Sequence, residues 1–324
     1  MGVIGVDGGN TKTELLAASL EGEPLVYVRG RGSNAHGLGV DGCVAVVAEL
    51  VERAHLDGEV EHGAFFLCGA DVPADIEALT AAVSARGWAA HTTVDNDTFA
   101  LLRTGTDSAD AVAVVCGAGI NCVGRAADGR IARYPALGWE TGDWGGSEEL
   151  GRAVLFHAAR AEDGRGERTA LVQVIREHFG VASVAEVGED VHYKRIREQR
   201  LGEVAPAVVA AADAGDGVAR GLVERLAEEV VLLALNALRD LGLAERAADV
   251  VLGGGMLREG AGLLHDEVVA RLAQRAPAAR PVVARDPPVL GAALAALDAV
   301  GADARAAERL RAAVRDGLTP EFVA

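Results

Sequence analysis

The sequence predicts an α/β protein made of two similarly built halves, because one order of elements occurs twice. In each half an apolar run leads into a glycine turn, a return strand, a second turn that pairs an acidic residue with glycine, and a third strand. The first copy covers residues 3–28 and the second covers residues 111–134. Short runs joined by such turns are typical of consecutive antiparallel strands. The repeat indicates a duplication that is visible in topology rather than in residue identity.

Each set of three strands is followed by segments with helical spacing or short buried runs. In the first half we expect, in order, a helix over 40–54, a strand over 64–68, a helix over 73–86, a strand over 91–94 and a helix after residue 97. In the second half we expect helices over 148–161, 169–179, 201–214 and 218–241, a strand over 250–252, a helix over 262–275, a strand over 282–284 and a helix over 287–297.

The polar residues 107–110 mark the expected domain boundary. A first domain then covers residues 1–108, and a second covers residues 109–301. An amphipathic stretch follows, and the segment 302–324 is a candidate to fold back as a helix that completes the first domain.

Composition restricts the class of protein. The chain has 324 residues and a formal net charge of −17, which argues against a nucleic-acid-binding face. We see no signal peptide and no apolar run long enough to span a bilayer, so we expect a cytoplasmic protein with no membrane partner. No CxxC pair or metal-ligand histidine spacing occurs, so free thiols are expected at Cys43, Cys68, Cys116 and Cys122.

The first glycine turn carries the first candidate site. Asp7 ends the opening apolar run, and Gly8-Gly9-Asn10-Thr11-Lys12-Thr13 follows. The amides of a glycine turn form an anion-binding concavity, and the threonines and lysine add donors to phosphate oxygens. A carboxylate at the strand end is placed to hold a hydrated Mg²⁺. Taken alone, the stretch is more typical of a plain β-hairpin.

Further polar and glycine-rich segments follow in order. They are Gly32-Ser33-Asn34, Asp95-Asn96-Asp97, Cys116-Gly117-Ala118-Gly119-Ile120-Asn121-Cys122, Gly138-Trp139 with Gly142-Asp143, and Val251-Leu252-Gly253-Gly254-Gly255. With the first turn, this ordered set resembles the N-acetylglucosamine kinase and BadF/BadG ATPase family of the actin, sugar kinase and Hsp70 ATPase superfamily. The resemblance covers residues 2–297. It implies a two-lobed actin-like (ribonuclease H-like) ATPase fold, with duplicated mixed-sheet domains around a cleft.

The resemblance also implies roles for single residues. The first turn from Asp7 to Thr13 is expected to hold the β- and γ-phosphates of ATP, with Asp7 acting on Mg²⁺. Gly117, Ala118 and Gly119 are expected at phosphates, and Gly253, Gly254 and Gly255 at the adenosine. A sugar substrate is expected at Ser33, Asn34, Asp97, Asn121, Gly138, Trp139 and Asp143. The family also implies a homodimer.

Asp97 is the expected catalytic base. A sugar hydroxyl is a poor nucleophile, and a carboxylate beside it can accept its proton as the phosphoryl group moves. The alternative is that the acidic run only caps the following helix. We assign catalysis to Asp97 and capping to Asp95. Asp143 is equally typical of a surface turn. The rings of Trp139 and Trp144 could lie against a sugar face but are more typical of packing, and His36 is expected to be a solvated loop residue.

Two departures from the family pattern bear on the substrate. Ala118 stands where the family's N-acetylglucosamine kinases carry a hydroxyl residue, and the stretch from Trp139 to Asp143 is shorter. The leading hypothesis is an ATP-dependent kinase of an amino sugar. One alternative is an ATPase that activates a partner enzyme through an iron–sulfur cluster, for which Cys116 and Cys122 are candidates. Another is a non-catalytic sugar sensor.

Other nucleotide-binding classes fit the sequence less well. A dehydrogenase is disfavoured because no GxGxxG precedes a helix, and the GxxxxGK[ST] phosphate loop is missing. The clustered-cysteine zinc motif of the other common bacterial sugar-kinase family is missing too.

Overall fold

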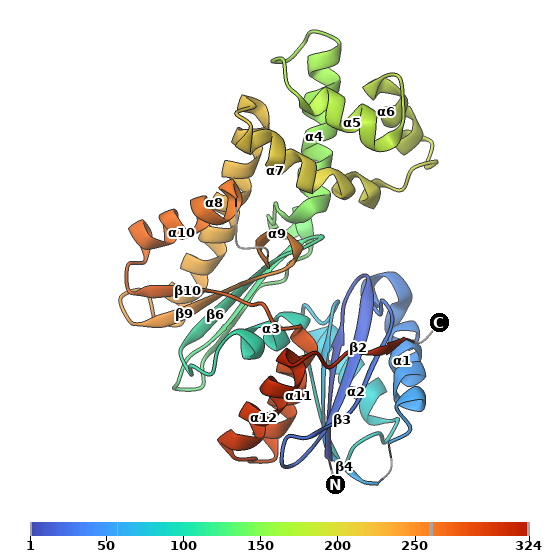
Figure 1. The fold of residues 1–324 in the computed structure, drawn as a ribbon, viewed down its shortest axis with the longest axis vertical. Helices are drawn as coiled ribbons and strands as arrows, with labels where there is room; N and C mark the ends of the chain where they lie inside the picture. The colour runs from blue at the N-terminus through green and yellow to red at the C-terminus, as the bar shows by residue number, and fades with distance from the viewer. Residues whose placement is uncertain (1, 57, 259–261, 323–324) are drawn as a thin grey trace. The chain divides into compact units, whose positions relative to one another are not determined.

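The computed structural model describes residues 2–56, 58–258 and 262–322 (Figure 1). These residues form two compact units. The first consists of Met1–Ala113, Arg133–Pro135 and Ala284–Ala324, and the second of Val114–Ala132 and Ala136–Val283. The chain therefore enters the first unit again at residue 284, not at residue 302 as the expected boundary has it.

The first unit is built on a six-stranded mixed sheet in the order β11-β3-β2-β1-β4-β5. Strands β1 (Gly2–Gly8), β2 (Lys12–Ser19) and β3 (Pro24–Arg31) form the expected antiparallel set. Strands β4 (Val60–Leu67) and β5 (His91–Asp95) continue the sheet parallel to β1. The short edge strand β11 (Glu321–Phe322) pairs parallel with β3 and carries no sequence signal that we recognised.

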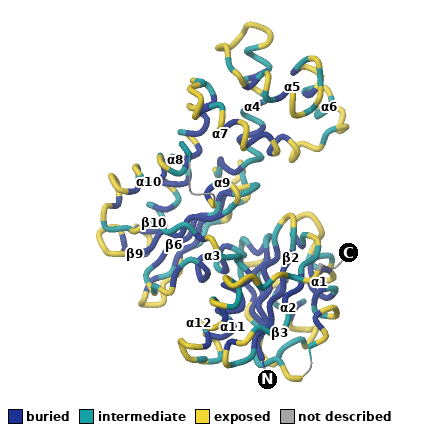
Figure 2. The backbone as a smooth tube through the Cα atoms, in the orientation of Figure 1, coloured by how far each residue is buried: buried dark blue, intermediate teal, exposed yellow. Residues whose placement is uncertain are grey.

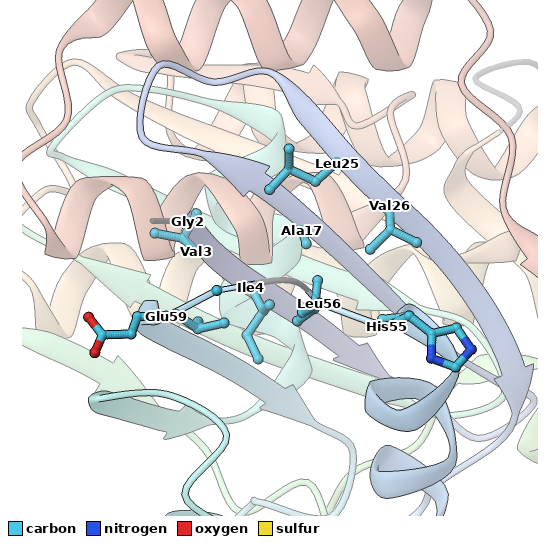
Figure 3. Close-up of a pocket in the computed structure, with 12 residues that line it drawn as sticks. Gly2, Val3, Ile4, Ala17, Leu25, Val26, His55, Leu56 and Glu59 are labelled. Carbon is cyan, nitrogen blue, oxygen red and sulfur yellow. The ribbon is translucent and has the colours of Figure 1, made fainter.

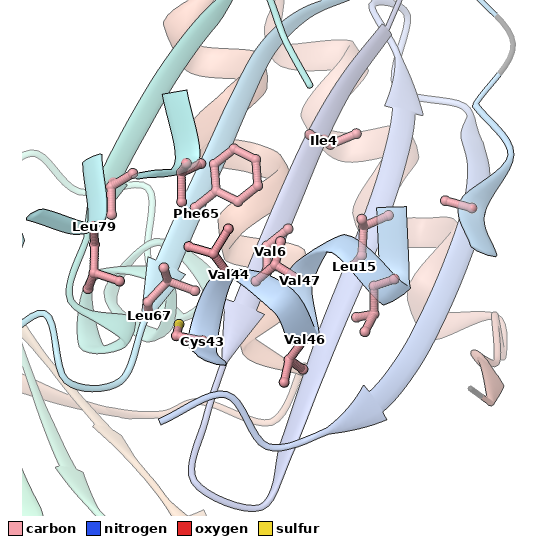
Figure 4. Close-up of a cluster of buried hydrophobic side chains, with 14 of the residues drawn as sticks. Ile4, Val6, Leu15, Cys43, Val44, Val46, Val47, Phe65, Leu67 and Leu79 are labelled. Atoms are coloured by element: carbon pink, nitrogen blue, oxygen red, sulfur yellow. The ribbon is translucent and has the colours of Figure 1, made fainter. Parts of the chain in front are cut away.

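Helices cover both faces of this sheet, so β1 is buried along its whole length. On one face, alternate residues such as Ile4, Val6 and Phe65 pack against α1 (Ala35–Ala54) and α2 (Pro73–Ser84), as Figure 4 shows. On the other face, Val3 and Leu16 pack against α3 (Asp97–Gly105), α11 (Pro288–Ala299) and α12 (Ala304–Arg315).

Glycines explain why α11 belongs to the first unit. A Cβ on Gly5 would lie 2.1 Å from the backbone nitrogen of Ala293, and one on Gly291 would lie 1.9 Å from the carbonyl oxygen of Ala100. Only residues without a side chain allow α11 to approach β1 and α3 this closely. The apolar residues of α11 are thereby buried against the first sheet.

The second unit repeats the sheet plan with five strands in the order β10-β9-β6-β7-β8. They are β6 (Ala111–Cys116), β7 (Ile120–Arg125), β8 (Ile131–Arg133), β9 (Ala248–Gly253) and β10 (Ala279–Val283). The first three residues of β6 and the last residue of β8 are grouped with the first unit. The fold class predicted from the repeat is confirmed. In both sheets the central strands, such as β1, β6 and β9, are largely buried (Figure 2).

Helical segments of the second unit are η1 (Gly138–Thr141), α4 (Gly146–Glu162), α5 (Leu171–Phe179), α6 (Val184–His192), η2 (Glu198–Val204), α7 (Ala205–Asp213), α8 (Gly217–Asp240), α9 (Gly255–Arg258) and α10 (Leu263–Arg275). The single helix expected over 201–214 is a 3₁₀ helix followed by α7. Helix α6 was not expected, although Ser183 and Glu186 form a capping box at its start. No helix within the described ranges is long and apolar enough to cross a membrane.

Candidate active site

Parallel pairing brings three acidic segments to one edge of the first sheet. In the register, Asp7 pairs with Phe66 and Phe66 pairs with Asp95, so β1, β4 and β5 end at the same level. The carboxyl ends of parallel strands in open α/β sheets are where ligands usually bind. The residues that follow these ends include Gly8, Asp71 and Asp97, and they form the candidate site of this unit.

The first glycine turn is fixed by backbone hydrogen bonds. The amide of Gly9 donates to the carbonyl of Lys12 at 2.9 Å, and the amide of Ser33 donates to the carbonyl of Gly9 at 3.0 Å. A Cβ at Gly8 would lie 2.5 Å from the hydroxyl of Ser33 and 2.7 Å from Leu67 Cδ2. Ser33 is fully buried and supports the turn from behind, so the turn has a defined shape without a ligand.

Lys12 is oriented by a buried carboxylate that the sequence analysis missed. Its ammonium group pairs with Glu14, whose side chain is fully buried. Glu14 also accepts from the hydroxyl of Tyr27 at 2.6 Å and from Nε of Arg29 at 2.8 Å. Burial raises the pKa of Glu14, but the hydrogen bonds from Lys12 and Tyr27 outweigh it, so this pKa lies below its ordinary value. Glu14 is therefore ionised and holds Lys12 at the turn.

Asp7 and Thr13 meet the requirements of a metal–phosphate site. Burial, followed by the charges of Asp97 and Glu14, raises the pKa of Asp7 well above its ordinary value, and a cation would relieve this cost. The hydroxyl of Thr13 is buried and has no hydrogen-bond partner among the described residues. A buried polar group without a partner is costly unless a ligand satisfies it. The residues thus fit Mg²⁺ and phosphate oxygens.

Asn34 and Asn10 connect the expected sugar loop to the phosphate turn. The side-chain amide of Asn34 donates to the side-chain oxygen of Asn10. The oxygen of Asn34 accepts from the amide of His36 at 2.8 Å and caps α1. Thr11, between these groups in the turn, is exposed. Both asparagines are therefore oriented before any ligand binds.

The expected capping role of Asp95 is wrong, because Asn96 is the N-cap of α3. The side-chain oxygen of Asn96 accepts from the amide of Thr98 at 2.9 Å. Asp95 instead forms an ion pair with Arg133, with oxygen–nitrogen distances of 2.7 and 3.1 Å. This leaves Asp97 at the first position of α3. Burial and then the charge of Asp71 raise the pKa of Asp97 to about 7.

Asp71 and His36 also belong to this cluster. The carboxylate of Asp71 accepts from the side-chain nitrogen of Asn96 at 2.7 Å and lies 3.5 Å from Nε2 of His36. His36 is exposed, as expected, but it lies in α1 rather than in a loop, and its Nε2 is also 3.7 Å from Asp75. Burial raises the pKa of Asp71 to about 6. In the sequence, Asp71 is marked only by its position as an acidic residue just after β4.

In the second unit, the turn at Gly117–Gly119 is tied to the start of α4. The amide of Gly117 donates to the carbonyl of Gly119 at 2.9 Å. The amides of Ser147 and Glu148 donate to the carbonyls of Gly117 and Ala118 at 2.8 and 3.0 Å. Asn121 is buried at the start of β7, where its side-chain oxygen accepts from the amide of Cys122 at 2.7 Å.

The third glycine segment lies against this second turn. Gly254 has φ of +86°, and a Cβ there would lie 2.3 Å from the carbonyl oxygen of Cys116. Gly253 ends β9 and Gly255 begins α9. The structure therefore brings together two glycine segments that are far apart in the sequence.

The loop over residues 138–144 separates its two tryptophans. Trp139 is 68% exposed, and its Nε1 donates to Glu149 at 3.1 Å. Trp144 is 7% exposed with the Arg225 guanidinium 3.9 Å from its ring centroid, so it is a packing residue. Asp143 accepts from the hydroxyl of Thr141, and its amide donates to the carbonyl of Gly138 at 2.9 Å.

Comparisons with known proteins place the chain in a family. Residues 4–296 match the model of the BadF/BadG/BcrA/BcrD ATPase family. The chain belongs to this family. An N-acetyl-D-glucosamine kinase of Dictyostelium discoideum is 26% identical over 312 residues, which cover 91% of this chain and 97% of that protein. An N-acetylmuramic acid/N-acetylglucosamine kinase of Clostridium acetobutylicum is 25% identical over 270 residues, covering 82% and 88%.

Solved structures of sugar kinases share the fold. A protein of Chromobacterium violaceum described as an N-acetylglucosamine kinase has a TM-score of 0.70 at 21% identity, with 90% of this chain and 98% of that chain covered. A ROK family glucokinase of Streptomyces griseus has a TM-score of 0.57 at 20% identity, with 91% and 98% covered. The predicted family and the actin-like sugar kinase fold are confirmed.

The cysteines of this member of the BadF/BadG/BcrA/BcrD ATPase family are free thiols. Cys116 and Cys122 are fully buried, and burial raises the pKa of Cys116 to about 12. Within the part of the chain that the structure describes, no group of three or more His, Cys, Asp or Glu side chains could hold a metal ion.

One pocket of this ATPase lies away from the candidate site. It has a volume of about 230 Å³ and opens at the first residues of β1, beside Leu25, Val26 and His55 (Figure 3). The glycine turn lies at the other end of the same strand. None of the expected ligand-binding residues lines this pocket.

Proposed function

We propose that this chain is a cytoplasmic, Mg²⁺-dependent kinase that transfers the γ-phosphoryl group of ATP to a hydroxyl of an N-acetylglucosamine-like amino sugar. The two curated relatives are named as kinases of N-acetylglucosamine or of N-acetylmuramic acid and N-acetylglucosamine. Membership of an ATPase family makes ATP the nucleotide. We also propose that the chain acts as a homodimer, which light scattering would test.

The observation that carries the proposal is the half-buried carboxylate of Asp97 beside the phosphate turn. Burial and Asp71 raise its pKa to about 7, and the charge of Asp97 in turn contributes to the raised pKa of Asp7. A general base is most effective when its pKa is close to the working pH. A residue whose only role was to cap a helix would not need burial and a neighbouring carboxylate that raise its pKa.

In the proposed reaction, a carboxylate oxygen of Asp97 accepts the proton of the sugar hydroxyl. The freed oxygen forms a bond to the γ-phosphorus as the bond to the β,γ-bridging oxygen breaks, and ADP leaves. The proton on Asp97 then passes to solvent. Lys12 and the hydroxyl of Thr13 would bind the phosphate oxygens, at the turn that Gly8 and Gly9 shape.

Asp7 would hold Mg²⁺, which when bound neutralises phosphate charge. Asn34 would bind sugar hydroxyls together with Asp97. From the second unit, we propose sugar contacts for Asn121, Gly138, Trp139 and Asp143, and nucleotide contacts for the segments Gly117–Gly119 and Gly253–Gly255.

A sugar screen tests this function. Purified protein with ATP and Mg²⁺ should release ADP only when a substrate sugar is present, and phosphorus NMR should show a sugar phosphate. The panel should contain N-acetylglucosamine, N-acetylmuramic acid, glucosamine, N-acetylmannosamine and glucose. Equal ADP release with and without sugar would contradict a kinase and indicate an ATPase.

A further inference from the structure

The loop after β4 contacts the starts of two helices that carry the proposed sugar-binding residues. The amide of Ala35 donates to the carbonyl of Cys68 at 3.2 Å, which joins this loop to the first residue of α1. Gly69, with φ of +91°, makes the approach possible, because a Cβ there would lie 3.1 Å from the amide nitrogens of Ala35 and His36. The loop therefore packs directly against the N-terminus of α1.

Asp71, two residues further along, contacts both helix starts with one carboxylate. Its Oδ1 accepts from Asn96 Nδ2 at 2.7 Å, and its Oδ2 lies 3.5 Å from His36 Nε2. The side chain of Asp71 is only 9% exposed. Asp71 thus accepts a hydrogen bond from the cap of α3 and lies within ion-pair distance of an imidazole of α1.

The two partners of Asp71 lie next to the residues proposed to act on the sugar. Asn96 precedes Asp97 and caps α3 by accepting from the amide of Thr98. His36 donates its own amide to Asn34, the cap of α1. Fixing Asn96 and His36 therefore fixes the backbone on either side of the sugar contacts.

We propose that Asp71 is a positioning residue, which holds Asn34 and Asp97 at the spacing that one sugar ring requires, through its contacts with Asn96, the cap of α3, and with His36 in the first turn of α1. Small displacements of catalytic groups cost up to about 100-fold in rate, so a fixed spacing matters. The proposal rests on the proposed kinase function for its effect on activity. The anchoring itself is a property of the free protein.

The test compares Asp71→Ala, which removes the acceptor, with Asp71→Asn, whose side-chain oxygen still accepts from Asn96. In Asp71→Ala we expect the sugar KM to rise and kcat to fall, each by roughly 10-fold or more, while the Kd for ATP stays as in the wild type. The first glycine turn, which is proposed to bind ATP, connects β1 and β2 and does not include Asp71. Asp71→Asn should recover most of kcat. Glu77→Ala, which removes an exposed carboxylate on α2, is the matched control.

Hydrogen exchange gives a readout that does not depend on activity. The amides of Thr98 and His36 should exchange faster in Asp71→Ala than in the wild type, and at the wild-type rate in Glu77→Ala. If the wild type phosphorylates no sugar, the proposed function is wrong. The exchange rates of these two amides still test whether Asp71 anchors the two helix starts. Unchanged exchange, or an equal loss of ATP and sugar affinity, would overturn the inference.

A second variant covers the case in which Asp71→Ala does not fold. His36→Gln removes the imidazole from Asp71 and leaves Asn96 in place. We expect a higher sugar KM, unchanged exchange at Thr98 and unchanged ATP affinity. A wild-type sugar KM in this variant would show that the α1 contact has no positioning role.

Discussion

Asp97 lies at the first position of α3, where Asn96 and not Asp97 is the N-cap. We expect Asp97→Asn to lower kcat by about 10²–10⁴-fold, because the amide cannot accept the hydroxyl proton. ATP affinity should be retained. A coupled ADP assay and calorimetry measure the two quantities. Asp41→Asn, an exposed residue of α1, is the control, and near-wild-type turnover in Asp97→Asn would remove Asp97 as the base.

The pH dependence of kcat/KM follows from the same carboxylate. Burial and then Asp71 raise the pKa of Asp97 to about 7, and the base works only when ionised. Activity should therefore be present above this pKa and be lost as the pH falls through it. Asp7, Asp71 and the amide of Thr98 are the groups that face this carboxyl.

Replacing Asp71 by Asn should change the pH at which kcat/KM is lost on the acidic side. Removing the negative charge of Asp71 takes away a cause of the raised pKa, so the loss of activity should occur at lower pH. Profiles of kcat/KM for the two proteins measure the shift. If kcat/KM falls at the same pH in both proteins, a group other than Asp97 controls this loss of activity.

Residues at strand ends were predictable, and residues that act through neighbours were not. Asp7 ends an apolar run, Asp97 follows a short strand, and both have a chemical reason to lie near a phosphate. Glu14 lies within β2, and its role depends on Tyr27 and Arg29 of β3, which only the strand register brings to it. Asp71 likewise becomes recognisable only when α1 and α3 start beside it.

At the scale of elements, the contact between α11 and α3 depends on a glycine. A Cβ at Gly291 would lie 1.9 Å from the carbonyl oxygen of Ala100 and 2.3 Å from Thr104 Oγ1. We expect Gly291→Ala to lower the free energy of unfolding by about 1–3 kcal/mol or more, because overpacking displaces a helix. Urea unfolding measures it.

Gly221→Ala is the matched control for this substitution. Gly221 lies in α8, and a Cβ there would meet nothing within 4 Å. Alanine is the better helix former by roughly 0.5–1 kcal/mol, so this change should stabilise the protein. Equal effects of the two substitutions would contradict the packing argument.

The same contact explains why the expected domain division differs from the structure. Helical spacing predicts α11, but it does not tell which sheet an Ala-rich helix covers. Gly5 and Gly291 are far apart in the sequence. They place α11 on the first sheet, because only a residue without a side chain allows α11 to pack so closely against β1 and α3. Helix α6 was missed because Gly188 and charged residues weaken its apolar pattern, and β11 is too short to have one.

At the scale of the whole molecule, the burial of the cysteines bears on the alternative activity as a partner-activating ATPase. Cys116 and Cys122 are fully buried in the second unit, and Cys43 is fully buried in the core of the first. Cluster ligation needs thiolates that can meet at one metal site. We expect protein purified without oxygen to contain no stoichiometric iron or sulfide. Elemental analysis and absorbance spectra measure this, and a bound cluster would contradict the kinase proposal.

The family and the fold class were predictable from the order of several weak motifs, because a duplicated sheet leaves its glycine turns at fixed places in each half. The choice of sugar was not. It depends on loops such as residues 138–144, where the structure gives Trp144 a packing role and leaves Trp139 exposed.

The hydrogen bond between Asn10 and Asn34 has a thermodynamic consequence. One asparagine belongs to the proposed phosphate turn and the other to the proposed sugar loop, so a ligand that reorients either side chain changes the state that the other ligand meets. Binding linkage is reciprocal: if ATP changes sugar affinity by some factor, the sugar changes ATP affinity by the same factor. Asn10→Ala should bring that factor closer to one, as calorimetric titrations of each ligand with and without the other would show. In Asn10→Ala, ATP and the sugar would then bind more nearly independently, whereas in the wild type each would change the affinity for the other.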